Sequence, residues 1–208
     1  MGPGRTIRGG GSPSAPPRSS DLLRGLVALA CVAAAFAGCG GGNDDQQKQS
    51  DLPAAPENIE FSTPNFKNGG AIPKDLTCDG AGKKPTIVWR ALPDGAVELV
   101  LVVEGPDASD GTFTHWTAWG IAAFSGAGLA PDGKFPAGLK EGKNSAGKIG
   151  WTPPCPPKGD DAHHYTFSFY ALKKGVTLEP GASPEAVRGV LKGALGRGTF
   201  TGTYKRAG

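Results

Sequence analysis

The stretch AVELVLVVEGPDASDGTFTHWTAWGI, Ala96 to Ile121, decides the fold class of this chain. Its first part is almost continuously apolar from Val97 to Val103, which is too apolar for a strand with one face in water and predicts a central strand covered on both faces. The second part alternates, as strands do. Its two faces are expected to carry His115, Thr117 and Trp119 on one side and Trp116, Ala118 and Gly120 on the other.

Further strand-like segments lie on both sides of this stretch. They are IEFSTPNF, TIVWRAL, HHYTFSFYAL and GTFTGTY, beginning at Ile59, Thr86, His163 and Gly198. In the third of them, Tyr165, Phe167 and Phe169 are predicted to share one face, which His163 continues.

One helix is predicted near the C-terminus. Ser183 can cap it and Pro184 suits its first position. Val187, Val190, Leu191 and Leu195 then repeat at helical spacing and would cover a sheet. The sequence therefore predicts a mainly β domain with Greek-key-like connections and one or two peripheral helices. The 34 glycines and 19 prolines among 208 residues indicate many turns between these elements.

The N-terminal segment is expected to lie outside this domain. Four arginines precede an apolar run, Leu26–Gly38, that is shorter than the roughly 20 residues needed to cross a bilayer. The run ends in FAGC, which resembles the lipobox of bacterial lipoproteins and predicts acylation of Cys39. The alternative is an ordinary signal peptide with a chance cysteine. We therefore expect a lipoprotein-type signal peptide at 1–38, a flexible tether at 39–57 and the domain at 58–206.

The charge of the chain belongs mostly to that signal segment. The formal net charge is +3, but without residues 1–38 the chain has equal numbers of basic and acidic residues. A neutral domain without basic clusters offers no electrostatic footprint for nucleic acid, so no nucleic-acid partner is expected.

Two of the four cysteines remain in the predicted domain. Cys31 would leave with the signal peptide and Cys39 would carry lipid, which leaves Cys78 and Cys155. In an oxidising compartment two such cysteines predict a disulfide, although two buried free thiols are the alternative.

Several motifs together resemble the phosphatidylethanolamine-binding protein (PEBP) family, most closely its bacterial Raf-kinase-inhibitor-like branch. In chain order they are IPKDLTCDG, PTIVW, EGPDA, HWTAWGI, PPCPPKGDDAHHYTFSFYAL and GTY, and the resemblance covers nearly all of Ile59–Tyr204. The resemblance implies a PEBP-like β-sandwich with a small pocket that accepts anions such as phosphate head groups. It also implies a binding or inhibitory protein rather than an enzyme.

The resemblance assigns four residues to that pocket. Asp107 matches the second aspartate of the family's D-P-D-A-P segment, in which Gly105 replaces the first aspartate and Ser109 the last proline. His115 matches the histidine of the H-W pair, and His163 and Tyr165 match H-x-Y. His164 is expected to face the other way and to be exposed.

These residue types suit an anion site. His115, His163 and Tyr165 can donate hydrogen bonds to it. Asp107 is expected to accept a hydrogen bond from one of these histidines and so to favour its imidazolium form. The aromatic side chains of Phe113, Trp116 and Trp119 are expected to wall the pocket or to pack beneath it.

Other functions have weaker support. No metal or other cofactor is expected, because closely spaced ligand pairs are missing from the sequence. A hydrolase with His115 as base is the enzymatic alternative, but the chain has no G-x-S-x-G motif.

We therefore expect a lipid-anchored extracytoplasmic binding protein whose partners are a small anion or phospholipid head group and the membrane. The competing hypothesis is an inhibitor or interaction module that binds a surface enzyme through Lys158–Ala162 and Ser125–Asn144.

Overall fold

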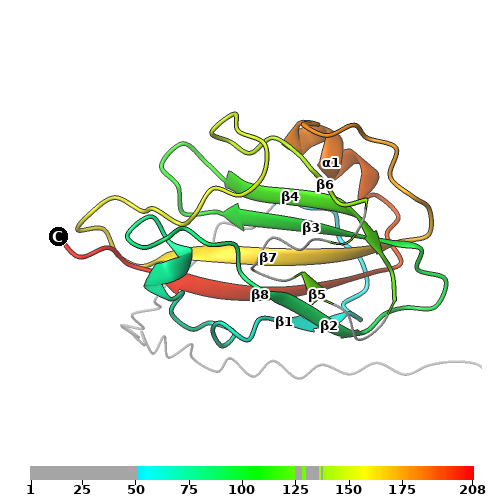
Figure 1. Ribbon diagram of the computed structural model, residues 1–208, viewed down its shortest axis with the longest axis horizontal. Coiled ribbons are helices and arrows are strands. Elements are labelled where there is room, and N and C mark those ends of the chain that lie inside the picture. The colour runs from blue at the N-terminus through cyan, green and yellow to red at the C-terminus, as the bar shows by residue number, and fades with distance from the viewer. Residues whose placement is uncertain (1–50, 125–127, 130–135, 137) are drawn as a thin grey trace, which may run out of the picture. The chain divides into compact units, whose positions relative to one another are not determined.

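The computed structural model describes residues 51–124, 128–129, 136 and 138–208. They form two antiparallel sheets and one α-helix (Figure 1). The predicted signal peptide, Cys31, the predicted lipidation site Cys39 and most of the predicted tether lie outside the described residues. Within the described ranges, no helix is long and apolar enough to span a membrane.

The larger sheet has five strands in the order β6-β4-β3-β7-β8. Their bounds are β3 Glu98–Gly105, β4 Phe113–Ala122, β6 Lys140–Glu141, β7 His163–Leu172 and β8 Gly196–Tyr204. Strand β3 is central, and its residues from Leu99 to Val103 are almost completely buried. This confirms the prediction from the apolar run. The pairs β3-β4 and β7-β8 are neighbours in sequence, whereas β7 returns beside β3 after a long connection, in agreement with the Greek-key-like expectation.

The smaller sheet has the order β1-β2-β5, with β1 at Glu60–Ser62, β2 at Ile87–Ala91 and β5 at Gly128–Leu129. The core cluster that includes Trp89 of this sheet also includes Leu101, Phe167 and Phe169 of the larger sheet. The rings of Trp89 and Phe169 lie 5.1 Å apart between their centroids. The described chain is therefore a mainly β sandwich, as predicted.

Helix α1, Pro184–Val190, packs beside β4 on the outer face of the five-stranded sheet, away from β1 and β2 (Figure 1). The Ser183 hydroxyl accepts a hydrogen bond from the Ala186 amide, which confirms the predicted cap. Val187 packs in a second apolar cluster that also contains Trp119. A short 3-10 helix, Lys74–Leu76, accompanies α1 as the second peripheral helix.

A β-bulge in β4 overturns one expectation about its faces. Val103 pairs with Trp116 and Glu104 with Thr114, so His115 is an extra residue opposite β3. A bulge of this kind changes the alternation of the strand. His115 contacts Tyr165, on the side of the inter-sheet core to which Trp116 also belongs. The prediction that His115 shares a face with Trp119 is therefore wrong.

The packed part of the chain begins earlier than the predicted boundary at residue 58. Leu52 is buried, and the Tyr170 hydroxyl donates a hydrogen bond to the carbonyl of Pro53 at 2.7 Å. Arg197 of β8 binds the carboxylate of Glu57. The last residues of the predicted tether therefore pack on the domain. They supply the apolar side chain of Leu52, a carbonyl that accepts from β7 and a carboxylate that binds β8.

Candidate functional site

A cavity of about 260 Å³ lies where β3 ends, β4 begins and β7 begins. All four residues predicted for the pocket line it, although they are far apart in sequence. Its lining consists of Gly105, Asp107, Ala108, Ser109, Phe113, His115, Thr152, Pro153, Cys155, Pro156, Pro157, Asp160, His163 and Tyr165. None of these described lining residues is a lysine or an arginine.

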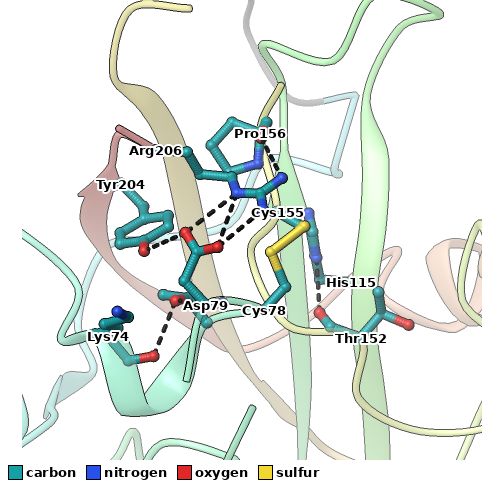
Figure 2. Close-up of a disulfide and its surroundings, with 10 residues drawn as sticks. Lys74, Cys78, Asp79, His115, Thr152, Cys155, Pro156, Tyr204 and Arg206 are labelled. Atoms are coloured by element: carbon teal, nitrogen blue, oxygen red, sulfur yellow. Dashed lines mark hydrogen bonds and ion pairs between the residues drawn. A yellow bond between two sulfur atoms is a disulfide. The ribbon is translucent and has the colours of Figure 1, made fainter. Parts of the chain in front are cut away.

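His115 is a buried histidine with a fixed orientation. The residue is 7% exposed, and ring nitrogen Nδ1 lies 2.8 Å from the carbonyl oxygen of Thr152 (Figure 2). A carbonyl can only accept, so Nδ1 carries the proton and Nε2 of the neutral ring has a free lone pair. Burial lowers the pKa of His115 to about 4, although the hydrogen bond to Thr152 opposes this shift. The expectation of an imidazolium does not hold for His115, because desolvation dominates.

Gly105 lies close to that lone pair and carries no side chain. A Cβ atom at position 105 would lie 3.0 Å from His115 Nε2 and 3.5 Å from Cε1 of Tyr165. The first distance is too short for unstrained contact, so any side chain at this position would press on the imidazole. The replacement of the family's aspartate by Gly105 therefore changes the steric surroundings of His115, besides removing a carboxylate.

Asp107 binds a histidine, but a different one from the histidines expected. Its Oδ2 atom accepts hydrogen bonds from the backbone amide of His164 at 2.7 Å and from its ring Nδ1 at 2.8 Å. His164 is thus partly buried beside Asp107 rather than turned away from it. Strand alternation did not reveal that the Asp107 carboxylate, in the β3–β4 turn, reaches His164.

The other two predicted residues come from β7. His163 Nε2 lies 3.4 Å from a carboxylate oxygen of Asp160, which precedes the strand. Tyr165 is 3% exposed, and its ring packs edge-on against His115 with centroids 5.1 Å apart. Burial is the main cause that raises the pKa of Tyr165, and the charge of Asp107 adds to it. The Tyr165 hydroxyl therefore keeps its proton and can donate a hydrogen bond.

The aromatic residues divide between the cavity and the core. Phe113 lines the cavity and packs on His115, with ring centroids 4.7 Å apart. Trp116 and Trp119 are completely buried in the two apolar clusters and are not among the lining residues. Thr152 and Asp160 were missed as site residues. Only their nearness in sequence to the proline-rich segment Pro153–Pro157 and to His163 could have indicated them.

The predicted disulfide between Cys78 and Cys155 is present, with 2.04 Å between the sulfur atoms (Figure 2). It joins the segment after the 3-10 helix to the proline-rich segment that forms one wall of the cavity. The amide of Cys78 also donates to the carbonyl of Pro154 at 3.0 Å. The wall of the cavity is thus fastened to the neighbouring loop.

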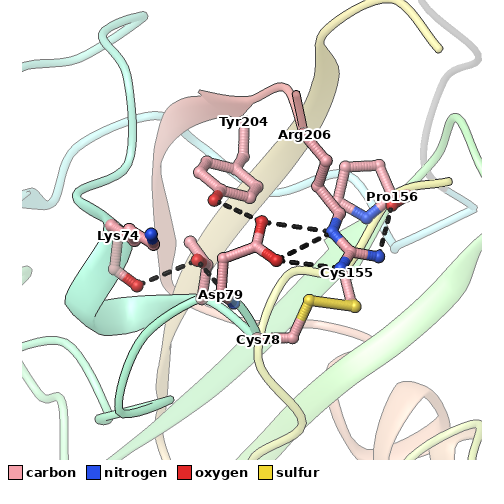
Figure 3. Close-up of polar contacts among 8 residues, drawn as sticks. Lys74, Cys78, Asp79, Cys155, Pro156, Tyr204 and Arg206 are labelled. Atoms are coloured by element: carbon pink, nitrogen blue, oxygen red, sulfur yellow. Dashed lines mark hydrogen bonds and ion pairs between the residues drawn. A yellow bond between two sulfur atoms is a disulfide. The ribbon is translucent and has the colours of Figure 1, made fainter. Parts of the chain in front are cut away.

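A second link fastens the same wall. The Arg206 guanidinium binds both carboxylate oxygens of Asp79 and reaches the carbonyl of Pro156, while the Tyr204 hydroxyl donates to Asp79 at 2.8 Å (Figure 3). The hydrogen bonds from Arg206 and Tyr204 hold the pKa of Asp79 below its usual value. The end of the chain therefore lies against the cavity wall, which no sequence motif indicated.

No group of three or more potential metal ligands of the His, Cys, Asp or Glu type occurs in the part of the chain that the structure describes. The cavity lining combines hydrogen-bond donors and acceptors with apolar side chains. Such a site suits a small polar ligand that several side chains contact at once.

Comparison with known proteins agrees with this architecture. The family described as "Phosphatidylethanolamine-binding protein" matches residues 62–205. "Putative lipoprotein LppC" of Mycobacterium tuberculosis strain H37Rv is 37% identical over 202 residues, which are 90% of this chain and 99% of that protein. A UPF0098 protein of Aquifex aeolicus is 40% identical over 152 residues, 71% of this chain and 89% of its own length.

Two crystal structures share the fold. A PEBP homologue from Chlamydia trachomatis, CT736, aligns with a TM-score of 0.65 and 32% identity, and covers 71% of this chain and 97% of its own. YbcL of E. coli, described as a member of the mammalian PEBP family, aligns with a TM-score of 0.66 and 27% identity over 71% of this chain and 98% of its own. The chain therefore belongs to the phosphatidylethanolamine-binding protein family.

Proposed function

We propose that this protein is a lipid-anchored extracytoplasmic binding protein that takes a small oxyanion, such as a phosphate head group, in the cavity at the ends of β3, β4 and β7. One observation carries the proposal: Asp107, His115, His163 and Tyr165, from separate parts of the chain, line the same cavity.

The cavity offers donors on more than one side. The hydroxyl of Tyr165, which keeps its proton, and the ring of His163 come from β7, and the hydroxyl of Ser109 comes from the β3–β4 turn. Oxyanions are held by several convergent donors in a partly dry site. The carboxylates of Asp107 and Asp160 each face an imidazole, which reduces their repulsion of an anion.

The membrane anchor rests on the sequence and on a relative. FAGC at Phe36–Cys39 resembles a lipobox, and the mycobacterial relative that aligns with almost the whole chain bears the name of a lipoprotein. Acylation of Cys39 would hold the domain at the outer surface of a membrane, where phosphate head groups are abundant.

Calorimetric titration of the protein with inorganic phosphate tests the binding site. The variant Tyr165→Phe removes one donor from the cavity and is expected to weaken binding by about tenfold. Tyr170→Phe is the matched control, because Tyr170 lies on β7 too but donates to Pro53 on the outer face. It should bind phosphate as the wild type does.

Equal phosphate affinity in the wild type and in Tyr165→Phe, or no saturable heat with the wild type, would contradict the proposal. The competing hypothesis of an inhibitor module stays a prediction. Lys158–Ala162, one of its two candidate segments, is exposed beside the cavity. That the protein is not an enzyme also stays a prediction.

A further inference from the structure

The cavity contains an acceptor that a fully deprotonated oxyanion cannot satisfy. The Nδ1–H group of His115 is used by the Thr152 carbonyl at 2.8 Å, so Nε2 can only accept while the ring is neutral. Asp107 and Asp160, which line the same cavity, are acceptors as well when ionised. A ligand that satisfies these acceptors must itself carry a hydrogen-bond donor.

The position of Gly105 makes Nε2 reachable. The atoms nearest to a Cβ placed at this position belong to His115, with Nε2 at 3.0 Å, and to the ring of Tyr165. Gly105 and His115 both line the cavity, so no side chain at position 105 stands between Nε2 and a ligand in the cavity. An O–H group of a ligand in the cavity can then approach the lone pair without meeting a side chain at position 105.

We propose that the site selects oxyacids that still carry a proton, and that the neutral His115 Nε2 accepts the hydrogen bond from that ligand O–H group. The inference rests on the proposed function and adds the chemical class of ligand. Phosphomonoesters have a second pKa near 6 and retain such a proton at mildly acidic pH, whereas sulfate esters do not. The site should therefore bind a phosphomonoester monoanion and reject a sulfate ester of the same shape and charge.

The low pKa of His115, about 4, supports this selection because the ring stays neutral at pH 5.5. The other titratable groups that line the cavity are Asp107, Asp160, His163 and Tyr165. A comparison of two ligands at one pH starts both titrations from the same protonation states of these groups. The two ligands then have similar shape and the same net charge, and only the phosphate ester carries a proton to donate.

The test is a calorimetric titration of the protein at pH 5.5 with methyl phosphate and with methyl sulfate. Both are mainly singly charged there, and only methyl phosphate has an O–H group. A buried acceptor left without a donor typically costs enough to weaken binding about tenfold or more. We expect methyl phosphate to bind at least about tenfold more tightly than methyl sulfate.

The outcomes separate the inference from the proposed function. Equal affinity for the two ligands would overturn the selection by a ligand proton while leaving an oxyanion site intact, since a protonated His115 would then act as donor. Binding of neither ligand would overturn both. An ¹⁵N spectrum of the complex with methyl phosphate should show Nε2 of His115 without a proton, and a protonated Nε2 would contradict the inference.

Two glycine variants complete the test. Gly105→Ala places a methyl group 3.0 Å from Nε2 and should weaken methyl phosphate binding by about tenfold or more. Gly189→Ala, on helix α1 with no atom within 4 Å of the added carbon, is the matched control and should bind as the wild type does. Unchanged binding in Gly105→Ala would show that Nε2 is not contacted.

Discussion

At the scale of single residues, the direction of one hydrogen bond determines what His115 can do. The Thr152 carbonyl fixes the proton on Nδ1, and burial disfavours a second proton. An aspartate at position 105, as in the family's usual segment, would place its Cβ against the imidazole. Gly105 leaves the lone pair of Nε2 open to the cavity instead.

This arrangement predicts a pH dependence of stability. The folded-state pKa of His115, about 4, lies below its ordinary value of 6.5, so the unfolded chain binds a proton first as the pH falls. Above pH 6.5 the ring is neutral in both states, so His115 does not lower the free energy of unfolding. As the pH falls from 6.5 to 4, the free energy of unfolding decreases progressively by roughly 3 kcal/mol. His115→Asn, which can still donate to Thr152 but cannot titrate, should lack this loss.

Urea unfolding of the wild type and of His115→Asn between pH 7 and pH 4 measures the difference. From pH 7 to pH 4, the free energy of unfolding of the wild type should fall relative to that of His115→Asn. Parallel curves would show that His115 does not resist protonation in the folded protein.

At the scale of elements, the cavity wall is a proline-rich segment that does not belong to either sheet. Two links hold it: the disulfide from Cys78 to Cys155, and Arg206, which bridges Asp79 and the carbonyl of Pro156. Both links start from adjacent residues, Cys78 and Asp79. The wall therefore depends on the 3-10 helix region on one side and on the last residues of the chain on the other.

Removal of the second link should loosen the wall. In Arg206→Ala the Asp79 carboxylate loses its bidentate partner, and the Cys78 amide, bonded to the Pro154 carbonyl, should exchange its hydrogen faster. Lys205→Ala is the control, because it removes only an exposed ion pair with Asp161. Hydrogen exchange followed by NMR measures both. Unchanged exchange of Cys78 in Arg206→Ala would mean that the disulfide alone holds the wall.

The elements themselves were predictable to different degrees. The apolar run Val97–Val103 identified the central strand, and Ser183 identified the start of α1. Both are local patterns: a continuous apolar run fits a strand buried on both faces, and a serine before proline fits a helix N-cap. The bulge at His115 was not predictable, since it depends on how β4 pairs with β3. The same holds for the Asp107–His164 pair, which joins two segments that only the fold brings together. The four cavity residues followed from the resemblance to a family, not from their spacing.

At the scale of the whole molecule, the chain combines a packed domain with a segment suited to membrane attachment. The contacts of Leu52, Pro53 and Glu57 show that the packed domain begins fewer residues after Cys39 in the sequence than predicted. The predicted tether is then limited to the residues between Cys39 and Leu52. On the proposed anchoring, the domain would stay near the membrane surface.

The variant Cys39→Ala tests this anchoring. If Cys39 is acylated, the wild type should be found in the membrane fraction and should incorporate labelled palmitate, while the variant should do neither. Cys31→Ala, within the apolar run, is the matched control and should behave as the wild type. A membrane-bound Cys39→Ala variant would show that another feature holds the protein there.

The central claim, a small-oxyanion site formed by these side chains, has a direct spectroscopic test. The chain contains three histidines, His115, His163 and His164, and all of them lie at or beside the cavity. Histidine-selective ¹⁵N labelling therefore reports on this site alone. Titration with inorganic phosphate should shift the ring signals of His115 and His163 along one saturable curve, and ring signals that stay unchanged up to high phosphate concentration would contradict the account.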